Sequence, residues 1–314
     1  MAEKTHPNEV GIAMMGATGS GKSTYLAALD HALIEKNCGW QVFAREPGSR
    51  KLLHELSTAL MSRREFPKPT AGIDRFEWRL ANEVSRTVRR GRFGNETITE
   101  PLEIPLNVTD ASGELARPDQ FGLADREALV QHLNKSNGIL YMFDPIREST
   151  NGDAYEKTNG LIQDLRAAAK EGFGGRLPHH LAVCLTKLDE PRIFATAREL
   201  DLLIDDDQNK WKFPRVLDTD ARILFDKLCE VGPDGNGEAL PSLLEQTFYP
   251  HRIRFYVTSA VGFMLNERTR KFDSQDTENV YRLASGKSVV RSPVHPINVV
   301  EPVLWLAKQL ALGA

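Results

Sequence analysis

Short, continuous apolar runs recur along the chain, and each is followed by a polar or glycine-containing loop. Runs of this length without polar alternation are typical of strands buried on both faces of a parallel sheet. Between them, apolar residues recur at helical spacing, so strands and helices alternate. The predicted buried strands are Val10–Met15, Ile139–Phe143, Leu181–Leu185 and Ile253–Val257, and the predicted helices cover residues 23–36, 49–61, 124–134, 158–170 and 193–203.

Two segments show strand patterns of another kind. Phe76, Trp78 and Leu80 alternate with polar residues, which indicates a half-exposed strand. Leu102–Val108 forms a second strand candidate, and the polar stretch Val88–Thr99, with its two glycines, joins the two. This arrangement predicts an antiparallel, hairpin-like pair.

The sequence therefore predicts an α/β fold: a mostly parallel sheet covered by helices on both faces, with one antiparallel hairpin pair and insertions. Residues 1–314 are interpreted as one elaborated domain. The segment between Asp189 and Ser259 contains several further helical patterns, so residues 191–250 are predicted to be an insertion on the core. In such folds, ligands bind at the carboxyl ends of the strands.

Composition narrows the class of protein. The chain is 41% hydrophobic and 26% charged, with a net charge of −3, which argues against disorder and against a broad basic surface for nucleic acid. Its three cysteines, Cys38, Cys184 and Cys229, lack the spacing of a zinc site or a disulfide framework and fit a reducing cytoplasm. The apolar stretch Val299–Leu312 is interrupted by polar residues and predicts a helix packed on the sheet, not a membrane span.

The strongest chemical motif follows the first predicted strand. Residues 16–23 read GATGSGKS, the phosphate-loop pattern, and a predicted helix follows directly. In this pattern backbone N–H groups surround phosphates, Lys22 reaches the β and γ phosphates, and Ser23 provides an oxygen to Mg²⁺. The predicted nucleotide-binding residues here are Gly16, Thr18, Gly19, Ser20, Gly21, Lys22, Ser23 and Thr24.

A bound Mg²⁺ also needs an acidic residue at the end of a neighbouring strand. Asp110 closes the apolar run ending at Thr109 and begins a D-x-x-G sequence that ends at Gly113. We expect the Asp110 carboxylate to hold Mg²⁺ through water and the Gly113 N–H to sense the γ phosphate.

Base selection is predicted from the sequence T-K-L-D, which follows the strand Leu181–Leu185. Asp189 can accept two hydrogen bonds from the N1 and N2 groups of guanine, which adenine lacks. Lys187 can lay its stem over the purine face. After the strand Ile253–Val257, residues Ser259 and Ala260 offer backbone N–H groups to guanine O6. The predicted base-binding residues are Thr186, Lys187, Asp189, Ser259 and Ala260.

Taken together, these motifs, in this order, resemble the GTPases of the translation-factor and Ras-like class. The segment Tyr25–Leu29, the loop Phe66–Thr70 and the segment Asn298–Trp305 also look like those of bacterial GTPases related to the double-GTPase families, which occur in multi-gene operons suspected of signalling or conflict roles. Only one set of motifs is present here, so a doubled architecture is not implied.

The resemblance implies further catalytic residues. Thr70, in a loop before a strand, is the candidate for the first-switch threonine that closes over Mg²⁺ and the γ phosphate. The class often has a glutamine after D-x-x-G to orient the attacking water, whereas this chain has Glu114. Arg117, Arg63 and Arg64 are candidate arginine fingers. The adjacent His179 and His180 are interpreted as loop histidines.

The expected function is a Mg²⁺-dependent GTPase that acts as a molecular switch, with GTP or GDP as ligand and an unknown protein effector or activator as partner. One alternative is a nucleotide-stabilised scaffold with little hydrolysis, which Glu114 motivates. Another is an ATP-dependent enzyme using the same loop, against which the T-K-L-D sequence argues.

Overall fold

The computed structural model describes residues 11–17, 19–67, 73–89, 95–111, 123–168, 175–206, 209–233 and 236–313. Its strands are β1 (Ile12–Gly16), β2 (Gln41–Phe43), β3 (Ile73–Arg89), β4 (Asn95–Ala111), β5 (Gly138–Phe143), β6 (His180–Leu185), β7 (Leu203–Asp205), β8 (Pro214–Val216), β9 (Ile253–Val257), β10 (Val280–Arg282) and β11 (Ser288–Val290). Its helices are α1 (Lys22–Lys36), α2 (Pro47–Ser57), the π-helical η1 (Thr58–Ser62), α3 (Leu123–Lys135), α4 (Pro145–Asn151), α5 (Ala154–Ala168), α6 (Pro191–Glu199), α7 (Ala221–Cys229), η4 (Asn236–Ala239), α8 (Leu240–Thr247), η5 (Pro250–Arg252) and α9 (Val300–Gly313).

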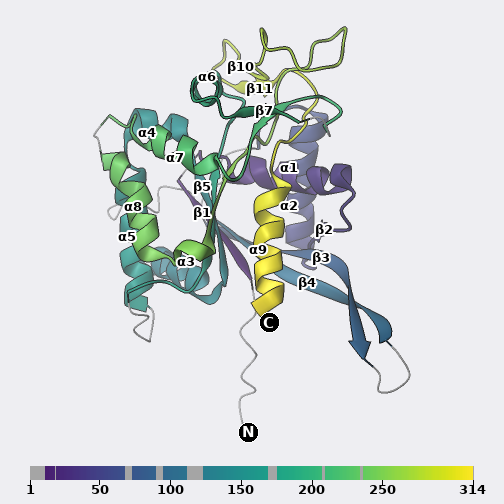
Figure 1. Cartoon of the computed structure of the whole chain (residues 1–314), viewed down its shortest axis with the longest axis vertical. Helices are drawn as coiled ribbons and strands as arrows, with labels where there is room; N and C mark the ends of the chain where they lie inside the picture. The colour runs from purple at the N-terminus through teal and green to yellow at the C-terminus, as the bar shows by residue number, and fades with distance from the viewer. Residues whose placement is uncertain are drawn as a thin grey trace.

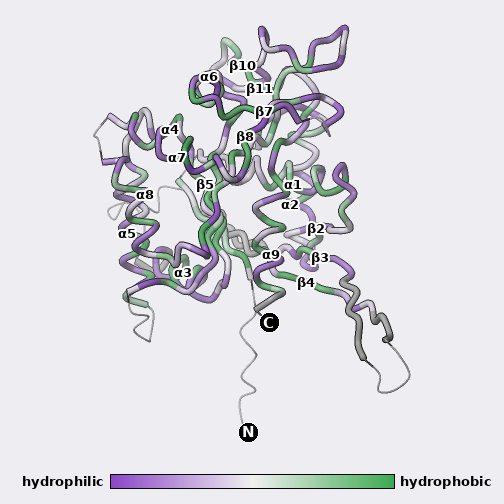
Figure 2. The backbone as a smooth tube through the Cα atoms, in the orientation of Figure 1, coloured by the Kyte–Doolittle hydropathy of each residue, from purple (hydrophilic) through white to green (hydrophobic). Residues whose placement is uncertain are grey.

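A seven-stranded sheet forms the centre of the fold, in the order β2-β3-β4-β1-β5-β6-β9 (Figure 1). Strands β4, β1, β5, β6 and β9 pair in parallel, while β3 is antiparallel to both of its neighbours. The hydrophobic strands run through the middle of the molecule, and the polar segments lie mostly outside (Figure 2). The predicted α/β fold with a mostly parallel, helix-covered sheet is confirmed.

Alternate side chains of the strands enter two separate hydrophobic cores. On β1, Ile12 and Met14 pack with α1, α2 and α9, whereas Ala13 and Met15 pack on the opposite face. That second core contains side chains of α3, α5, α6, α7 and α8. Successive side chains of a strand point to opposite faces, so a strand buried on both faces is apolar at every position, as the sequence pattern indicated.

The hairpin pair is much longer than predicted. β3 and β4 each contain 17 residues and pair without interruption from Ile73–Ala111 to Arg89–Asn95. Most of the polar stretch that was predicted to join them is strand. In Figure 1 this two-stranded ribbon extends beyond the body of the sheet.

Several helices begin or end at other residues than predicted. The helix expected over residues 49–61 is α2 followed by the π-helical turn η1. Helix α4 and the short pair β10–β11 were not predicted. Helix α9 packs on the sheet as expected, and no helix within the described residues has the length and apolarity needed to cross a bilayer. The interpretation of residues 191–250 as an insertion stays a prediction.

Candidate functional site

The order of the strands reverses at β1, which lies between β4 and β5. Helix α1 leaves β1 on one face of the sheet, and α3, which leads into β5, packs on the other. Such a reversal opens a crevice at the carboxyl ends of the strands, where open α/β sheets bind their ligands. Register pairs Gly16 with Met142, and Leu185 with both Phe143 and Val257. The loops after β1, β5, β6 and β9 therefore meet at one edge of the sheet.

The loop after β1, residues 16–23, is called the glycine loop here. Close packing makes a side chain at Gly16 impossible, because a Cβ atom would lie 2.6 Å from the Met142 carbonyl oxygen and 2.8 Å from Ser20 Oγ. The Ser20 N–H donates to the Ala17 carbonyl at 3.2 Å, which closes the loop. Gly19 is exposed, Gly21 is the N-cap of α1, and Thr18 lies outside the described residues.

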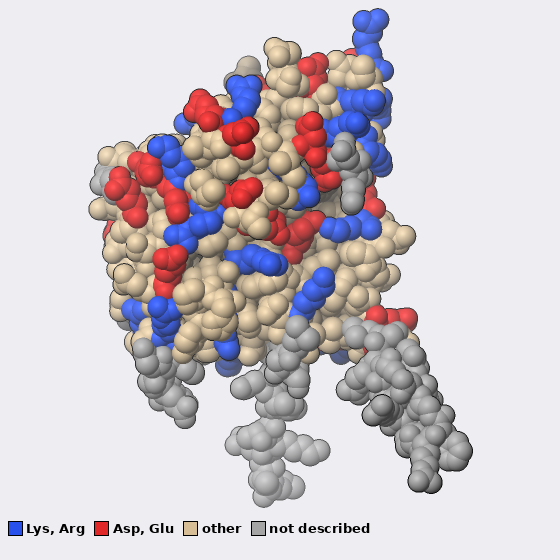
Figure 3. All heavy atoms as spheres, in the orientation of Figure 1, with Lys and Arg blue, Asp and Glu red and all other residues tan. Residues whose placement is uncertain are grey.

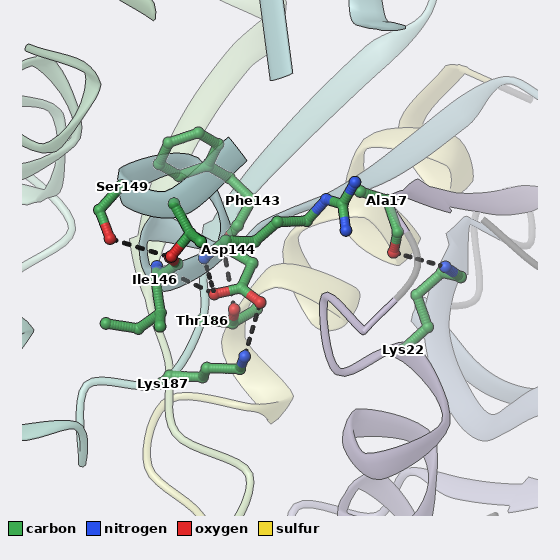
Figure 4. A network of polar contacts seen from close by, with 10 residues as sticks. Ala17, Lys22, Phe143, Asp144, Ile146, Ser149, Thr186 and Lys187 are labelled. Carbon is green, nitrogen blue, oxygen red and sulfur yellow. Dashed lines mark hydrogen bonds and ion pairs between the residues drawn. The ribbon is translucent and has the colours of Figure 1, made fainter. Parts of the chain in front are cut away.

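Lys22 begins α1 and bends back over the glycine loop. Its ammonium donates to the carbonyl oxygens of Gly16 at 2.9 Å and of Ala17 at 3.0 Å, and the residue is only 7% exposed (Figure 4). Ser23 and Thr24 follow in the first helical turn and are half-buried. Gly21 gives this turn no side-chain cap, and the positive end of the helix dipole lies at the N-terminus of α1, where the glycine loop ends.

The predicted Mg²⁺ residue Asp110 lies on β4, the parallel neighbour of β1. Asn107 pairs with Ala13, and Asp110 and Gly16 each lie three residues further on, at the same edge of the sheet. The backbone of Asp110 thus ends up beside the glycine loop, although β4 continues one residue beyond it. Thr70, Gly113, Glu114 and Arg117 lie outside the described residues.

The turn after β6, Thr186–Asp189, is called the lysine–aspartate turn, and the turn after β9, Ser259–Gly262, the serine turn. The Ser259 hydroxyl donates to Asp189 Oδ1 at 2.5 Å and accepts from the Gly262 N–H at 2.8 Å. The Leu188 N–H donates to the Thr258 carbonyl at 3.1 Å. These bonds join the two turns into one unit and bring Asp189, Ser259 and the half-buried Ala260 together, as the motif order predicted.

Burial makes Asp189 an unusual carboxyl group. The residue is 7% exposed, and this desolvation raises its pKa to about 6, although the Ser259 hydrogen bond acts in the opposite direction. A buried carboxylate with a raised pKa gains free energy from any further donor to its ionised form. Two N–H donors on one edge of a base can supply such hydrogen bonds to the ionised carboxylate.

Lys187 and Thr186 connect the lysine–aspartate turn to β5. The Thr186 N–H and hydroxyl both donate to the Phe143 carbonyl, at 2.9 and 3.1 Å. The Lys187 ammonium lies 2.5 Å from Asp144 Oδ2 (Figure 4). Asp144 was missed in the sequence. A signal was present, since Asp144 follows a buried strand and precedes Pro145, and an aspartate before a proline is a helix-start pattern.

A segment near the end of the chain fixes the serine turn. Ser259 and Ile297 exchange backbone hydrogen bonds of 3.0 and 2.8 Å, and the His295 N–H donates to the Val261 carbonyl. Gly262 has a φ of 68°, and a Cβ atom there would lie 2.1 Å from the His295 carbonyl oxygen. Only glycine fits this position, which the motif alone did not indicate.

Two further predictions from the sequence concern the adjacent histidines and the candidate arginine fingers. His179 is buried, and its Nε2 lies 3.2 Å from the Leu133 carbonyl oxygen, while burial lowers its pKa to about 4. His179 lies in the loop before β6, and its side chain is buried, which the sequence did not indicate. His180 is the first residue of β6. The Arg64 guanidinium donates to the Arg291 carbonyl at 3.0 Å, which ties it to the β10–β11 region.

No protein-family model matches this chain, and no curated protein matches its sequence. Among solved structures, similarity was found to the signal recognition particle receptor SRb-GTP/SRX complex from Chaetomium thermophilum, at 9% identity and a TM-score of 0.33, covering 82% of this chain and 93% of that one. The S. cerevisiae Ski7 GTPase-like domain bound to GTP is 13% identical, with a TM-score of 0.39 and coverage of 98% and 51%. Sup35 complexed with GDP is 11% identical, with a TM-score of 0.31 and coverage of 85% and 42%. This chain thus spans about half of the Ski7 chain and less of the Sup35 chain.

Proposed function

We propose that this chain binds guanine nucleotides with Mg²⁺ and hydrolyses GTP as a nucleotide-controlled molecular switch. The observation that carries the proposal is the buried Asp189 carboxylate, which accepts a hydrogen bond from Ser259. It lies at the same edge of the sheet as the glycine loop, which leads from β1 into α1. A nucleotide is long enough that its phosphates and its base must contact loops from different strands. Strands β1, β5 and β6 are adjacent in the sheet, so the loops that follow them can contact both ends of one nucleotide. One end of this site suits phosphate, and the other suits a base with two N–H donors.

At the phosphate end, the proposed ligands are backbone N–H groups of the glycine loop and the Lys22 ammonium. Lys22 lies on carbonyl oxygens of its own loop, so its charge is already directed to the loop interior. Anions bind at such a helix N-terminus because N–H groups and the helix dipole both favour negative charge.

The residues proposed for Mg²⁺ are Ser23, Asp110 and Thr70. Their donors are hydroxyl and carboxylate oxygens, the ligands that Mg²⁺ prefers. Ser23 is in α1, which follows β1, and Asp110 is on β4, the parallel neighbour of β1. When bound, the ion would neutralise part of the negative charge of the phosphates.

Hydrolysis is proposed to involve Lys22, Thr70, Gly113 and Glu114. If Glu114 faces the γ phosphate, its charge opposes the hydrolytic geometry, and intrinsic turnover is slow. Single-turnover GTP hydrolysis at saturating nucleotide and Mg²⁺ tests this: Glu114→Gln should match or exceed the wild type, and Glu114→Ala should stay below Glu114→Gln. Equal rates in all three proteins would contradict a catalytic role for Glu114. Binding without turnover, with or without a partner, would favour the scaffold alternative.

A protein effector or activator is the proposed partner, and nucleic acid is not. On the face shown in Figure 3, acidic and basic side chains are interspersed over most of the surface. Mixed charge of this kind gives no wide positive field to attract a polyanion.

The decisive experiment is a nucleotide panel. Affinities for GTP, GDP, ATP and ADP are measured by competition against a fluorescent guanine nucleotide, with and without Mg²⁺. The proposal expects guanine nucleotides to bind at least about a hundredfold more tightly than adenine nucleotides. Preference for ATP would support the alternative of an ATP-dependent enzyme and overturn the guanine assignment.

A further inference from the structure

Asp144 occupies the position between the two ends of the proposed nucleotide site. It is the first residue after β5, and β5 is flanked by β1 on one side and β6 on the other. The glycine loop therefore begins on one side of Asp144 and the lysine–aspartate turn on the other. Figure 4 shows Asp144 and Lys187 pointing toward one another, with Ala17 and Lys22 across from them.

The two oxygens of the Asp144 carboxylate have separate partners. Oδ1 caps helix α4 by accepting from the N–H groups of Ile146 at 3.1 Å and Arg147 at 3.3 Å. Oδ2 accepts from the Lys187 ammonium at 2.5 Å. The Asp144 side chain is only 3% exposed. Because the backbone of α4 holds one oxygen in place, the carboxylate is a fixed anchor for the lysine.

Lys187 itself is in need of such an anchor. Its side chain is 35% exposed, and a lysine side chain carries about 2 kcal/mol of rotamer entropy when it is unrestrained. Its backbone φ of 66° lies in the left-handed region, so the turn already directs this residue differently from its neighbours. The ion pair stretches the four-carbon stem between the end of β6 and the end of β5.

We propose that Asp144 is a positioning residue of the nucleotide site, which holds the Lys187 stem as a preformed wall for the purine face. This inference rests on the proposed guanine-nucleotide function. The stem offers methylene groups and no hydrogen bond to the edge of the base, so the anchor acts on affinity for every purine nucleotide alike. Choice of base stays with Asp189, which has a different partner, Ser259. Preorganisation of this kind raises affinity by removing an ordering cost from the binding step.

The test uses Asp144→Asn in the full chain. The asparagine side-chain oxygen still accepts from the first turn of α4, so the helix cap is kept while the ionic partner of Lys187 is lost. We expect the Kd values for GDP, GTP and inosine diphosphate (IDP) all to rise by about tenfold. The ratio of GDP to IDP affinity, which reports the contact to the guanine amino group, is expected to stay unchanged. Thermal unfolding of the nucleotide-free protein is expected to match the wild type.

A double-mutant cycle with Lys187→Met shows whether Asp144 acts through Lys187. In that background, Asp144→Asn is expected to have no further effect on the Kd for GDP, because no ammonium remains to be anchored. The matched control is Asp153→Asn. Asp153 is likewise an ion-paired aspartate near α4, although it is half-buried, and its ion-pair partners are Arg147 at 2.6 Å and Lys157 at 2.5 Å instead of Lys187. We expect it to bind GDP as the wild type does.

The outcomes separate the two proposals. A wild-type protein that binds no guanine nucleotide overturns the proposed function itself. A wild type that binds GDP, with an unchanged Kd in Asp144→Asn, overturns only the role of Asp144. An equal loss from Asp144→Asn in the wild-type and Lys187→Met backgrounds overturns it as well, since the aspartate would then act through another group. A changed GDP-to-IDP ratio would place Asp144 in base selection and contradict the positioning role.

Discussion

The two ends of the proposed nucleotide site are built by different means. At the glycine loop, the backbone makes the structure: Gly16 allows close packing against Met142, and Lys22 bonds to carbonyl oxygens of the same loop. At the base end, side chains from distant parts of the chain make it: Asp189 with Ser259, and Lys187 with Asp144. The phosphate end is therefore local in sequence, whereas the base end depends on tertiary structure. Substitutions should affect the two ends in different ways.

The largest effect is expected from Lys22→Ala. It removes the cation of the phosphate end, and losing one partner of a buried charge pair costs about 4 kcal/mol, roughly a thousandfold in affinity. GTP and GDP binding should weaken together, as measured by competition with a fluorescent nucleotide. Lys36→Ala, on the same helix, is the control, because Lys36 pairs with Glu301 at the far end of α1. If Lys22→Ala and Lys36→Ala bind GTP and GDP with equal affinity, the assignment of the glycine loop to the nucleotide site is contradicted.

Asp189→Asn should act on the base alone. The amide cannot accept both guanine N–H groups and presents donors of its own, so guanine preference should fall by about a hundredfold. Xanthine nucleotides, which have a carbonyl in place of the guanine amine, should bind the variant better than the wild type. Affinities of both proteins for GDP, xanthosine diphosphate (XDP) and ADP, measured side by side, test this change in base preference. If GDP and XDP affinities both stay as in the wild type, Asp189 does not read the base.

Gly262→Ala tests the dependence of the base end on tertiary structure. A methyl group at this position meets the His295 carbonyl at 2.1 Å in a left-handed conformation, so we expect a loss of about 2–3 kcal/mol in unfolding free energy. The Kd for GDP should rise as the serine turn is displaced. Gly48→Ala is the matched control, since nothing lies within 4 Å of its Cβ position and Gly48 is in helix α2. Chemical denaturation of both variants gives the comparison, and equal stability of the two would contradict the close packing at Gly262.

The smallest expected effect is a pH dependence of the base end. Burial raises the pKa of Asp189 to about 6, so below that pH the carboxyl is protonated and loses its acceptors for guanine. GDP affinity should fall by about tenfold per pH unit below 6 in the wild type, beyond any change seen in Asp189→Asn. The free energy of unfolding changes with pH in the opposite direction. Because the pKa of Asp189 in the folded protein is above its ordinary value of 3.8, the nucleotide-free wild type should gain stability relative to Asp189→Asn as the pH falls from about 6 to about 4. If GDP affinity and stability each change with pH in the same way in the wild type and in Asp189→Asn, the raised pKa of Asp189 is contradicted.

The same contrast explains which features could be predicted from the sequence. The buried strands and the glycine loop could be predicted because a strand buried on both faces is a continuous apolar run and the phosphate-loop pattern is local. The length of the β3–β4 ribbon could not, since Pro101 disfavours a strand interior and lies within β4 only through the cross-strand pairing with β3, where its partner is Glu83. The need for glycine at position 262 could not be predicted either, because it comes from His295, a residue distant in the chain.

Helix α4 shows a third case, in which the local signal was present but weak. It contains only seven residues, too few for helical periodicity to be visible, and its start is marked by Asp144 and Pro145 alone. The ion pair of Asp144 with Lys187 follows from the adjacency of β5 and β6, which the sequence does not give.

The bonds between the serine turn and residues 295–299 have a consequence for protein synthesis. A ribosome produces residues 16–23 early, but Ser259 needs Ile297 as its backbone partner, and the Tyr25 hydroxyl of α1 donates to the Val299 carbonyl at 2.5 Å. A nascent chain thus contains the glycine loop while the proposed base end of the site is still incomplete. On the proposed function, tight and selective nucleotide binding therefore becomes possible only after those late residues have left the exit tunnel, and in the growing polypeptide the early loop offers no more than weak contact with phosphate.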